Sequence, residues 1–361
     1  MKILIICTSI DNYLKKQIDA LRFSKKQVDV LDLVEYKMYF DNGKTIHIRP
    51  KTKFKLLEHF FVSDEINEYY RRRELFDYLD RYDIVNLYKC SQYSIDIKDK
   101  IEHISLKYTI TLNDLLPRKS SKLEELYASS KAFFFQNDRL KQSFNHIYGY
   151  EAKSFVLYEP VELLKIYEEI DLEVLKKFTD YLCVNDDKIK IFCHFHGSKI
   201  KQKELVISLA NLPIEVKKAS TFFLYLDNED KNINKEIILM LESIKLDYVI
   251  IKKDATKEQL AMLLKISSAS VFIDHSPFND ILITSIYAKN HPFLYKSKEI
   301  DHIFTKEKIF LDDFKEFYFF FEKDEINEGL YKEIYKRNKQ KIYELFSYKS
   351  FEERFISAIL K

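Results

Sequence analysis

A basic turn near the middle of the chain carries residue types that bind a diphosphate. It follows a predicted strand and leads into a predicted helix, and it contains His196, Gly197, Ser198, Lys199, Lys201 and Lys203. Lysine ammonium groups and the N–H groups at a helix N-terminus both bind phosphate oxygens. The turn therefore predicts a diphosphate site. The alternative interpretation is a solvated basic turn without a ligand.

A second polar segment lies between another predicted strand and the helix that follows it. Asn279 and Thr284 could hydrogen-bond to sugar hydroxyls, and Asp274 could accept a hydrogen bond from a ribose or a base. Asp280 stands beside Asn279, and either residue is also suited to cap the helix. We expect this segment to complete a binding pocket with the basic turn, and simple helix capping is the alternative.

Three polar residues in the first half of the chain follow predicted strand ends, namely Asp11, Asn113 and Asp114. A carboxylate at such a position could act as a general base on a hydroxyl group, which makes Asp11 and Asp114 candidate catalytic residues with Asn113 beside them. Aspartate and asparagine are also common in turns and caps, so a purely local role is the alternative for each.

A metal site is not expected from the sequence. His194 and His196 alternate at a strand end and therefore point the same way, but the sequence offers no third ligand, and we expect His196 to hydrogen-bond at a cleft edge. No two of the four cysteines have the C-x-x-C spacing of a zinc cage; they are Cys7, Cys90, Cys183 and Cys193. Their scatter also argues against a disulfide framework and suits a reducing compartment.

Composition narrows the function classes further. The chain has 361 residues, enough for two domains, and its 59 basic and 57 acidic residues give a net charge of only +2. That balance argues against a nucleic-acid partner. Only 4 glycines are present, with neither G-x-G-x-x-G nor G-x-x-x-x-G-K-[ST] among them, which argues against the common dinucleotide and P-loop sites.

Apolar runs and amphipathic stretches alternate along the chain in two series. In the first series, strands are expected at 2–7, 28–33, 83–88, 108–112, 132–136 and 154–158. In the second, they are expected at 188–193, 221–226, 248–251, 270–273 and 292–295. This alternation predicts an α/β fold of two doubly wound, Rossmann-like domains facing across a cleft, with ligands at the carboxyl ends of the strands. We expect the domains at 1–165 and 166–340, and a C-terminal helix at 341–361 that returns towards the first domain.

Six short motifs in order resemble those of GT-B glycosyltransferases, in particular glycosyltransferase family 4, over nearly the whole chain. The first half contains segments similar to the family's YDIVH, T-x-H-D and IPNGVD stretches, at 82–86, 111–114 and 157–162. The second half contains segments similar to its G-R-x(5)-K-G, ADVFVLPS and FSWE stretches, at 196–203, 256–276 and 346–348. The resemblance implies a GT-B transferase that moves a sugar from a nucleotide-sugar donor to a glycan, lipid-linked or protein acceptor. It also implies a reaction that requires no metal and no other cofactor.

The residues with which the family does its chemistry differ in this chain. Asn279 and Tyr287 stand where the resemblance places the E-x(7)-E pair. Asn86 and Asn113 stand where it places histidines, and Ser198 replaces an arginine. Two alternatives to the transferase follow. One is a catalytically inactive GT-B-like partner subunit of a glycosylation complex, and the other is a nucleotide-sugar epimerase of the same fold.

The sequence also bears on location. The first residues are too few and too early for a signal peptide, and no apolar run approaches the roughly 18 residues of a membrane span, so we expect a cytoplasmic protein. Basic clusters at 49–55 and 71–73, with Phe60 and Phe61 between them, would suit peripheral contact with the inner face of the cell membrane. Solvated helix faces are the alternative interpretation of these clusters.

Overall fold

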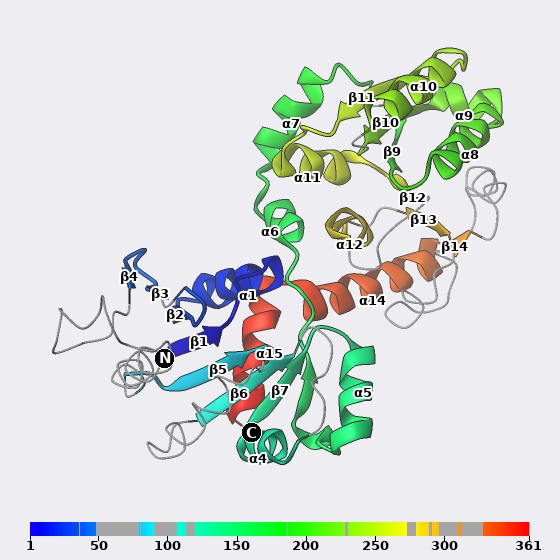
Figure 1. Ribbon diagram of the computed structural model, residues 1–361. Coiled ribbons are helices and arrows are strands. Elements are labelled where there is room, and N and C mark those ends of the chain that lie inside the picture. Colours follow the sequence, from blue (N-terminus) through cyan, green and yellow to red (C-terminus); the bar gives the residue numbers. More distant parts are fainter. Residues whose placement is uncertain are drawn as a thin grey trace. The chain divides into compact units, whose positions relative to one another are not determined.

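A computed structural model describes most of the chain. The chain divides into two compact units. The described residues are 1–35, 37–47, 79, 81–89, 107–112, 120–185, 187–227, 230–272, 279–288, 291–295, 310–311 and 328–360. Unit 1 comprises Met1–Pro160 together with Tyr348–Lys361, and unit 2 comprises Val161–Ser347. The unit boundaries therefore lie at 160/161 and 347/348, compared with the 165/166 and 340/341 expected from the sequence. Figure 1 shows the elements of each unit.

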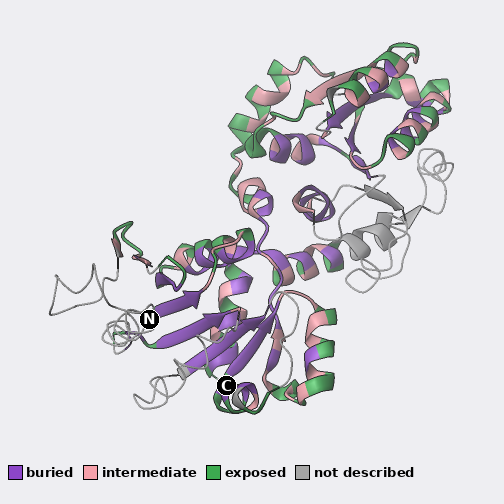
Figure 2. Cartoon of the chain, viewed as in Figure 1, coloured by how far each residue is buried: buried purple, intermediate pink, exposed green. Residues whose placement is uncertain are grey.

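The described strands of unit 1 form one eight-stranded sheet in the order β4-β3-β2-β1-β5-β6-β7-β8. The strands that pair in parallel are β1 (Lys2–Cys7), β2 (Gln27–Asp32), β5 (Ile84–Tyr88), β6 (Lys107–Leu112), β7 (Ala132–Phe135) and β8 (Ser154–Val156). Two short antiparallel strands extend the edge beside β2, namely β3 (Lys37–Tyr39) and β4 (Thr45–His47). The parallel strands are nearly continuous apolar runs because both of their faces are buried (Figure 2).

Helices cover both faces of this sheet. The described helices of unit 1 are α1 (Asn12–Phe23), α4 (Ser121–Ser129), α5 (Asp138–Tyr148) and α15 (Tyr348–Leu360), with a 3-10 turn at Glu151–Lys153. One core contains residues of β1, α1 and α15. The core on the opposite face is rich in aromatic rings, with Tyr127 of α4 and Phe144 of α5 5.3 Å apart between ring centroids. The final helix of the chain is thus part of the first unit.

Unit 2 contains a parallel sheet whose described strands run in the order β11-β10-β9-β12-β13-β14. These strands are β9 (Ile189–Phe195), β10 (Ser220–Leu226), β11 (Tyr248–Lys252), β12 (Ala269–Phe272), β13 (His291–Tyr295) and β14 (Phe310–Leu311). The helices described in unit 2 are α6 (Glu162–Glu169), α7 (Leu172–Tyr181), α8 (Lys199–Ala210), α9 (Ile214–Ala219), α10 (Lys231–Glu242), α11 (Lys257–Ile266), α12 (Asp280–Tyr287) and α14 (Glu328–Phe346).

Each sheet has a topological switch point, where the chain changes the direction in which it adds strands. In unit 2, β9 lies between β10 and β12, so the chain leaves β9 towards one edge and later returns to its other side. In unit 1, β1 lies in the same way between β2 and β5. Open α/β sheets bind ligands outside the carboxyl ends of the strands at such points. The fold therefore singles out the residues that follow β9 and β12, and those that follow β1 and β5.

The prediction of an α/β fold with two doubly wound, Rossmann-like halves is confirmed. The antiparallel strands β3 and β4 were not predicted. Both basic clusters expected to contact a membrane, at 49–55 and 71–73, lie outside the described residues, as do Phe60 and Phe61. Within the part of the chain that the structure describes, no helix combines the length and the apolar character that crossing a bilayer requires.

Candidate functional site

The turn after β9 is built around a left-handed glycine and the start of α8. Gly197 has a φ of +88°, a conformation that strains any residue with a side chain. Ser198 caps α8, and its hydroxyl accepts from the Lys201 N–H at 3.4 Å. The side chain of the buried Gln202 donates a hydrogen bond from Nε2 to the Gly197 carbonyl at 3.0 Å, and this bond holds the turn against the first turns of α8. The N-terminus of a twelve-residue helix thus lies at the switch point of unit 2. The sequence analysis placed Lys199, Lys201 and Lys203 on a turn before this helix, but all three belong to the helix itself.

The two lysines expected to bind a diphosphate share one carboxylate. Lys199 Nζ lies 2.5 Å from Oε2 of Glu236 on α10, and Lys203 Nζ pairs with Oε1 of the same residue. The hydrogen bonds from Lys199 and Lys203 hold the pKa of Glu236 below its ordinary value. An incoming anion at these lysines must therefore compete with Glu236, a partner that the sequence analysis did not identify.

The start of α12 lies beyond β12, the strand next to β9. Asn279 caps this helix by accepting from the N–H groups of Ile281 and Leu282 at 2.8 and 3.3 Å. Asp280 is the first helical residue and is partly exposed. Thr284 is fully buried, and its hydroxyl has no hydrogen-bond partner among the described residues. Asn279 and Asp280 therefore lie where a ligand could reach them, whereas Thr284 lies inside the core.

Tyr287, at the other end of α12, is part of the packing of unit 2. Its hydroxyl donates to Oε1 of Glu168 on α6 at 2.6 Å, and its ring meets Tyr167 edge-on at 5.9 Å between centroids. Lys339 of α14 lies over the same ring, with Nζ 4.6 Å from its centroid. Tyr287 thus stands where glycosyltransferase family 4 has the second glutamate of its E-x(7)-E pair, and its side chain contacts both α6 and α14.

Asp11 in unit 1 occupies the carboxyl edge between β1 and β5. One oxygen caps α1 by accepting from the Leu14 N–H at 2.9 Å, and it also accepts from the Tyr88 hydroxyl at 2.7 Å. The other lies 3.0 Å from Lys89 Nζ. Burial alone would raise the pKa of Asp11, but the hydrogen bonds from Leu14, Tyr88 and Lys89 outweigh it and lower the pKa below the ordinary aspartate value. Asp11 is therefore held as a stable anion, which reduces its strength as a base.

Three of the predicted site residues cannot be placed. Asn113, Asp114 and Asp274 lie outside the described residues, so the structure neither joins them to the other candidates nor separates them. Of the remainder, the basic turn and the start of α12 follow neighbouring strands of the same sheet, because β9 pairs with β12. Asp11 belongs to the other unit.

One residue that the sequence analysis missed, Asp227, completes a cluster with two histidines. Its Oδ2 lies 3.4 Å from His194 Nε2 and 3.5 Å from His196 Nδ1. Burial alone would raise the pKa of Asp227, but the hydrogen bond from His194 and the charges of His194, His196 and Lys253 lower it. The sequence held a signal for this residue, because Asp227 directly follows the predicted strand at 221–226, just as His194 directly follows the predicted strand at 188–193.

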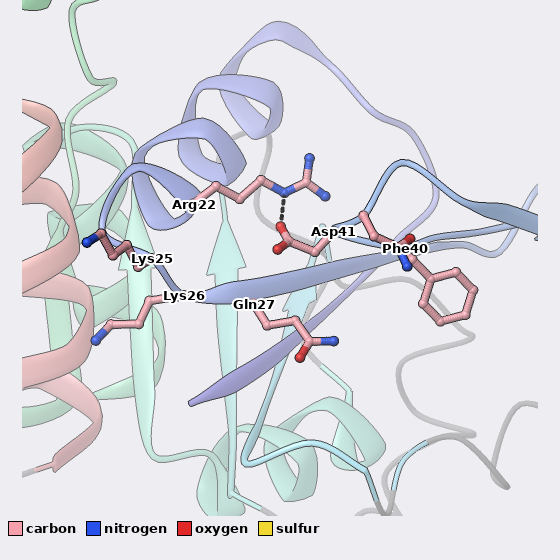
Figure 3. A pocket seen from close by; sticks show the side chains of 7 residues that line it. Arg22, Lys25, Lys26, Gln27, Phe40 and Asp41 are labelled. Carbon is pink, nitrogen blue, oxygen red and sulfur yellow. Dashed lines mark ion pairs between the residues drawn. The ribbon is translucent and has the colours of Figure 1, made fainter.

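A cavity of about 530 Å³ in unit 1 lies at the other end of its sheet. Figure 3 shows it between the end of α1 and the start of β2, with Arg22 directed at Asp41 and 2.7 Å between Nε and Oδ1. Its lining residues are Arg22, Lys25, Lys26, Gln27, Phe40, Asp41 and Asn42. Because β2 starts at Gln27, the cavity lies at the amino ends of the parallel strands of unit 1, opposite the carboxyl ends where Asp11 lies.

No protein-family model matches the sequence, and no curated protein sequence matches it significantly. Solved structures do resemble the fold over its full length. A glycosyltransferase from Rickettsia africae is 13% identical with a TM-score of 0.60, and covers 100% of this chain and 98% of its own.

Two further solved structures each match this chain over its full length and over 100% of their own length. Anabaena HepE in complex with UDP is 12% identical with a TM-score of 0.57, and a UDP-GlcNAc 2-epimerase from Neisseria meningitidis bound to UDP-GlcNAc has the same two values. These likenesses do not single out glycosyltransferase family 4, which stays a prediction. The structure and its likenesses together show that this chain has the GT-B fold.

Proposed function

We propose that the protein is a glycosyltransferase that moves a sugar from a nucleotide-sugar donor to a glycan, lipid-linked or protein acceptor. The observation that carries the proposal is the pair of helix N-termini at the switch point of unit 2. Helix α8 begins just after β9, and α12 follows the neighbouring strand β12. Helix N-termini carry partial positive charge and unpaired N–H groups, which suit a diphosphate. Structures similar to this one were solved with UDP, UDP-glucose or UDP-GlcNAc.

In this proposal the diphosphate lies at the start of α8. The backbone around Gly197 and Ser198 supplies N–H donors, and Lys199 and Lys203 add positive charge after exchanging Glu236 for the phosphate. Charge that develops on the leaving diphosphate is stabilised by these groups, so the transfer requires no metal. His196 precedes the turn and can donate a hydrogen bond to the same ligand.

The sugar and ribose hydroxyls lie towards α12 in the same proposal. Asn279 and Asp280 are partly exposed at its first turn, and Asp274 is assigned to this pocket from the sequence pattern. Thr284 was also predicted to bind the donor, but its side chain is fully buried, so in this proposal it packs inside the core below α12 and does not contact the ligand. On the acceptor side, Asp114 with Asn113 beside it is our candidate base, because the carboxylate of Asp11 is committed to a cap and to Lys89.

Ligand-dependent stability tests the donor site. A ligand that binds the folded state raises the unfolding free energy by RT ln(1 + [L]/Kd), about 2.7 kcal/mol at a hundredfold excess over Kd. We expect at least one nucleoside diphosphate, or its sugar conjugate, to raise the melting temperature at millimolar concentration. If UDP, GDP, ADP, CDP and their common sugar conjugates all leave it unchanged, the donor site is refuted.

Variants test the location of that site. Lys203→Ala should reduce the shift, because Lys203 lies one turn after Lys199 on α8 and shares its partner Glu236. Lys218→Ala is the matched control: this exposed lysine lies on α9, which leads into the amino end of β10, at the opposite edge of the sheet. Equal shifts in the two variants would place the nucleotide elsewhere.

A catalytically inactive GT-B-like partner subunit is the second candidate function. Tyr287 favours it, since this side chain joins α6, α12 and α14 where the resembling family has a carboxylate. An inactive subunit could still bind a nucleotide sugar but would neither transfer nor hydrolyse it. Incubation of the protein with the nucleotide sugar that gives the largest thermal shift, followed by measurement of released nucleoside diphosphate, separates the two. Release supports the enzyme, and binding without release under all acceptor conditions supports the partner subunit.

A further inference from the structure

We propose that His194, His196 and Asp227 form a binding site for a divalent transition-metal ion, with zinc as the best-matched ion. The proposal concerns metal binding alone. It goes beyond the sugar transfer proposed above, which does not require this ion, and it holds whether or not the protein transfers a sugar.

The two distances from Asp227 to the histidines match the spacing of ligands around zinc. Zinc binds imidazole nitrogen and carboxylate oxygen at about 2.0–2.2 Å in tetrahedral geometry, so two such ligand atoms lie roughly 3.4 Å apart. Here the Asp227 Oδ2 lies 3.4 Å from His194 Nε2 and 3.5 Å from His196 Nδ1. The contact between His194 and Asp227 is a long hydrogen bond, beyond the usual 2.7–3.2 Å or so, and a bound ion would replace it. One ligand atom from each of the three residues lies within 4.8 Å of the others, so small side-chain rotations would bring all three onto one ion.

The three ligands come from a rigid part of the fold. His194 lies in β9 and His196 follows it two residues later, so the two rings are on the same face and stack at 5.4 Å between centroids. Asp227 is held beside them because its N–H donates to the Phe195 carbonyl at 3.2 Å, which continues the pairing of β10 with β9. His194 lies in β9, and His196 and Asp227 directly follow the ends of β9 and β10, so the pairing of these strands limits the movement of the ligands.

Packing around the cluster fixes the histidine rings. His194 is fully buried, with Tyr225 stacked on it at 5.3 Å and Phe272 edge-on at 5.8 Å. An apolar surround of this kind orients metal ligands and limits the access of solvent. The side chains of His196 and Asp227 are 41% and 23% exposed, so an ion can enter from one side.

The ligand set also indicates the kind of ion. Two imidazoles and one carboxylate favour zinc and neighbouring transition metals over magnesium or calcium, which prefer all-oxygen sites. Three protein ligands leave a fourth tetrahedral position for water or for an anionic oxygen of a bound molecule. The turn at Gly197 and the start of α8 follow His196 directly in the chain, so the cluster lies close in sequence to a helix N-terminus.

Metal titration of the full-length protein tests the proposal. The protein is stripped with a chelator and dialysed, and it is then titrated with Zn²⁺ by calorimetry and with Co²⁺ by visible absorption. We expect one ion per chain and the intense visible bands of tetrahedral cobalt. Asp227→Asn and His196→Ala should each weaken Zn²⁺ binding by about a hundredfold. Both residues are partly exposed, so we expect these variants to fold, and circular dichroism verifies that they do.

Two control variants remove the same residue types elsewhere. Asp254→Asn and His146→Ala change exposed residues outside the cluster and should bind Zn²⁺ as tightly as the parent protein. The proposal is overturned if the parent protein shows no saturable binding of one ion per chain. It is also overturned if the folded Asp227→Asn and His196→Ala proteins bind Zn²⁺ with the parent's affinity.

Discussion

Lys199 of α8 and Glu236 of α10 form an ion pair across two helices, with 2.5 Å between Nζ and Oε2. The same carboxylate also pairs with Lys203. The two lysines that could neutralise a bound diphosphate therefore already have an anionic partner. Glu236 lies at the surface, so its hold on the lysines is weakened by solvent and salt.

Removing the charge of Glu236 should strengthen nucleotide binding. In Glu236→Gln the lysines no longer interact with a carboxylate, and we expect the dissociation constant for a nucleoside diphosphate to fall about two- to fivefold at low salt. The gain should shrink as salt is raised. Calorimetry with UDP measures the effect, and Glu242→Gln, an exposed glutamate on the same helix, is the control. Unchanged affinity in Glu236→Gln would show that Lys199 and Lys203 do not contact the phosphates.

Asp11 should contribute to stability in a pH-dependent way. Its pKa in the folded protein lies below the ordinary value of 3.8, so its ionised form stabilises the fold at pH values above 3.8. That contribution is lost as the pH falls through the lowered pKa, because Asp11 is then protonated in both states.

Two substitutions separate the charge of Asp11 from its capping role. Asp11→Asn keeps a cap for α1 but loses the charge next to Lys89, and we expect it to cost a few tenths to about 1 kcal/mol at pH 7. Asp11→Ala loses both and should cost about 1 kcal/mol more. Urea unfolding between pH 2 and 7 measures this, and a cost of Asp11→Asn that does not shrink at low pH would contradict the assignment.

Thr284→Val should leave the protein equally stable or make it more stable. The Thr284 hydroxyl is fully buried and has no hydrogen-bond partner among the described residues, so a methyl group of similar shape removes an unsatisfied polar atom. Nucleotide affinity should stay at the parent value, because the side chain lies inside the core. Thermal unfolding with and without UDP measures both effects. A clear loss of affinity with unchanged stability would return Thr284 to the binding pocket.

Phe355→Ala should destabilise unit 1 strongly. Phe355 of α15 is 1% exposed, and its ring stacks on Phe134 of β7 with 4.7 Å between centroids. Truncation of a buried phenylalanine costs about 3–5 kcal/mol through lost burial and the cavity left behind. Leu360→Ala, at an exposed position of the same helix, should cost less than about 0.5 kcal/mol. Similar unfolding midpoints for the two variants would contradict the packing of α15 against the sheet.

The positions of strands that are buried on both faces could be predicted from the sequence. Segments such as Lys2–Cys7 and Ala132–Phe135 are apolar runs because helices cover both sides of the sheet, and their positions were predicted closely. The short edge strands β3 and β4 were missed. Each has three residues, too few for an alternating pattern to be recognised, and they form through pairing with β2 and with each other.

The site was harder to predict because its partners are brought together by the order of the strands. The basic turn and its capping serine are local features, so their place at the start of α8 could be anticipated. Glu236 and Asp227 could not be paired with the turn from sequence, since both depend on β10 and α10 lying next to β9 and α8. For the same reason the histidine pair lacked a third ligand until Asp227 was placed beside it.

The membership of α15 in unit 1 has a consequence for how the protein is made. Unit 2 is one uninterrupted stretch, Val161–Ser347, and is complete as soon as that stretch has left the ribosome. Unit 1 lacks the rings of Phe351 and Phe355 until the last helix is synthesised. We therefore expect the second half of the polypeptide to reach its final form before the first half does, which reverses the usual order in which nascent domains mature.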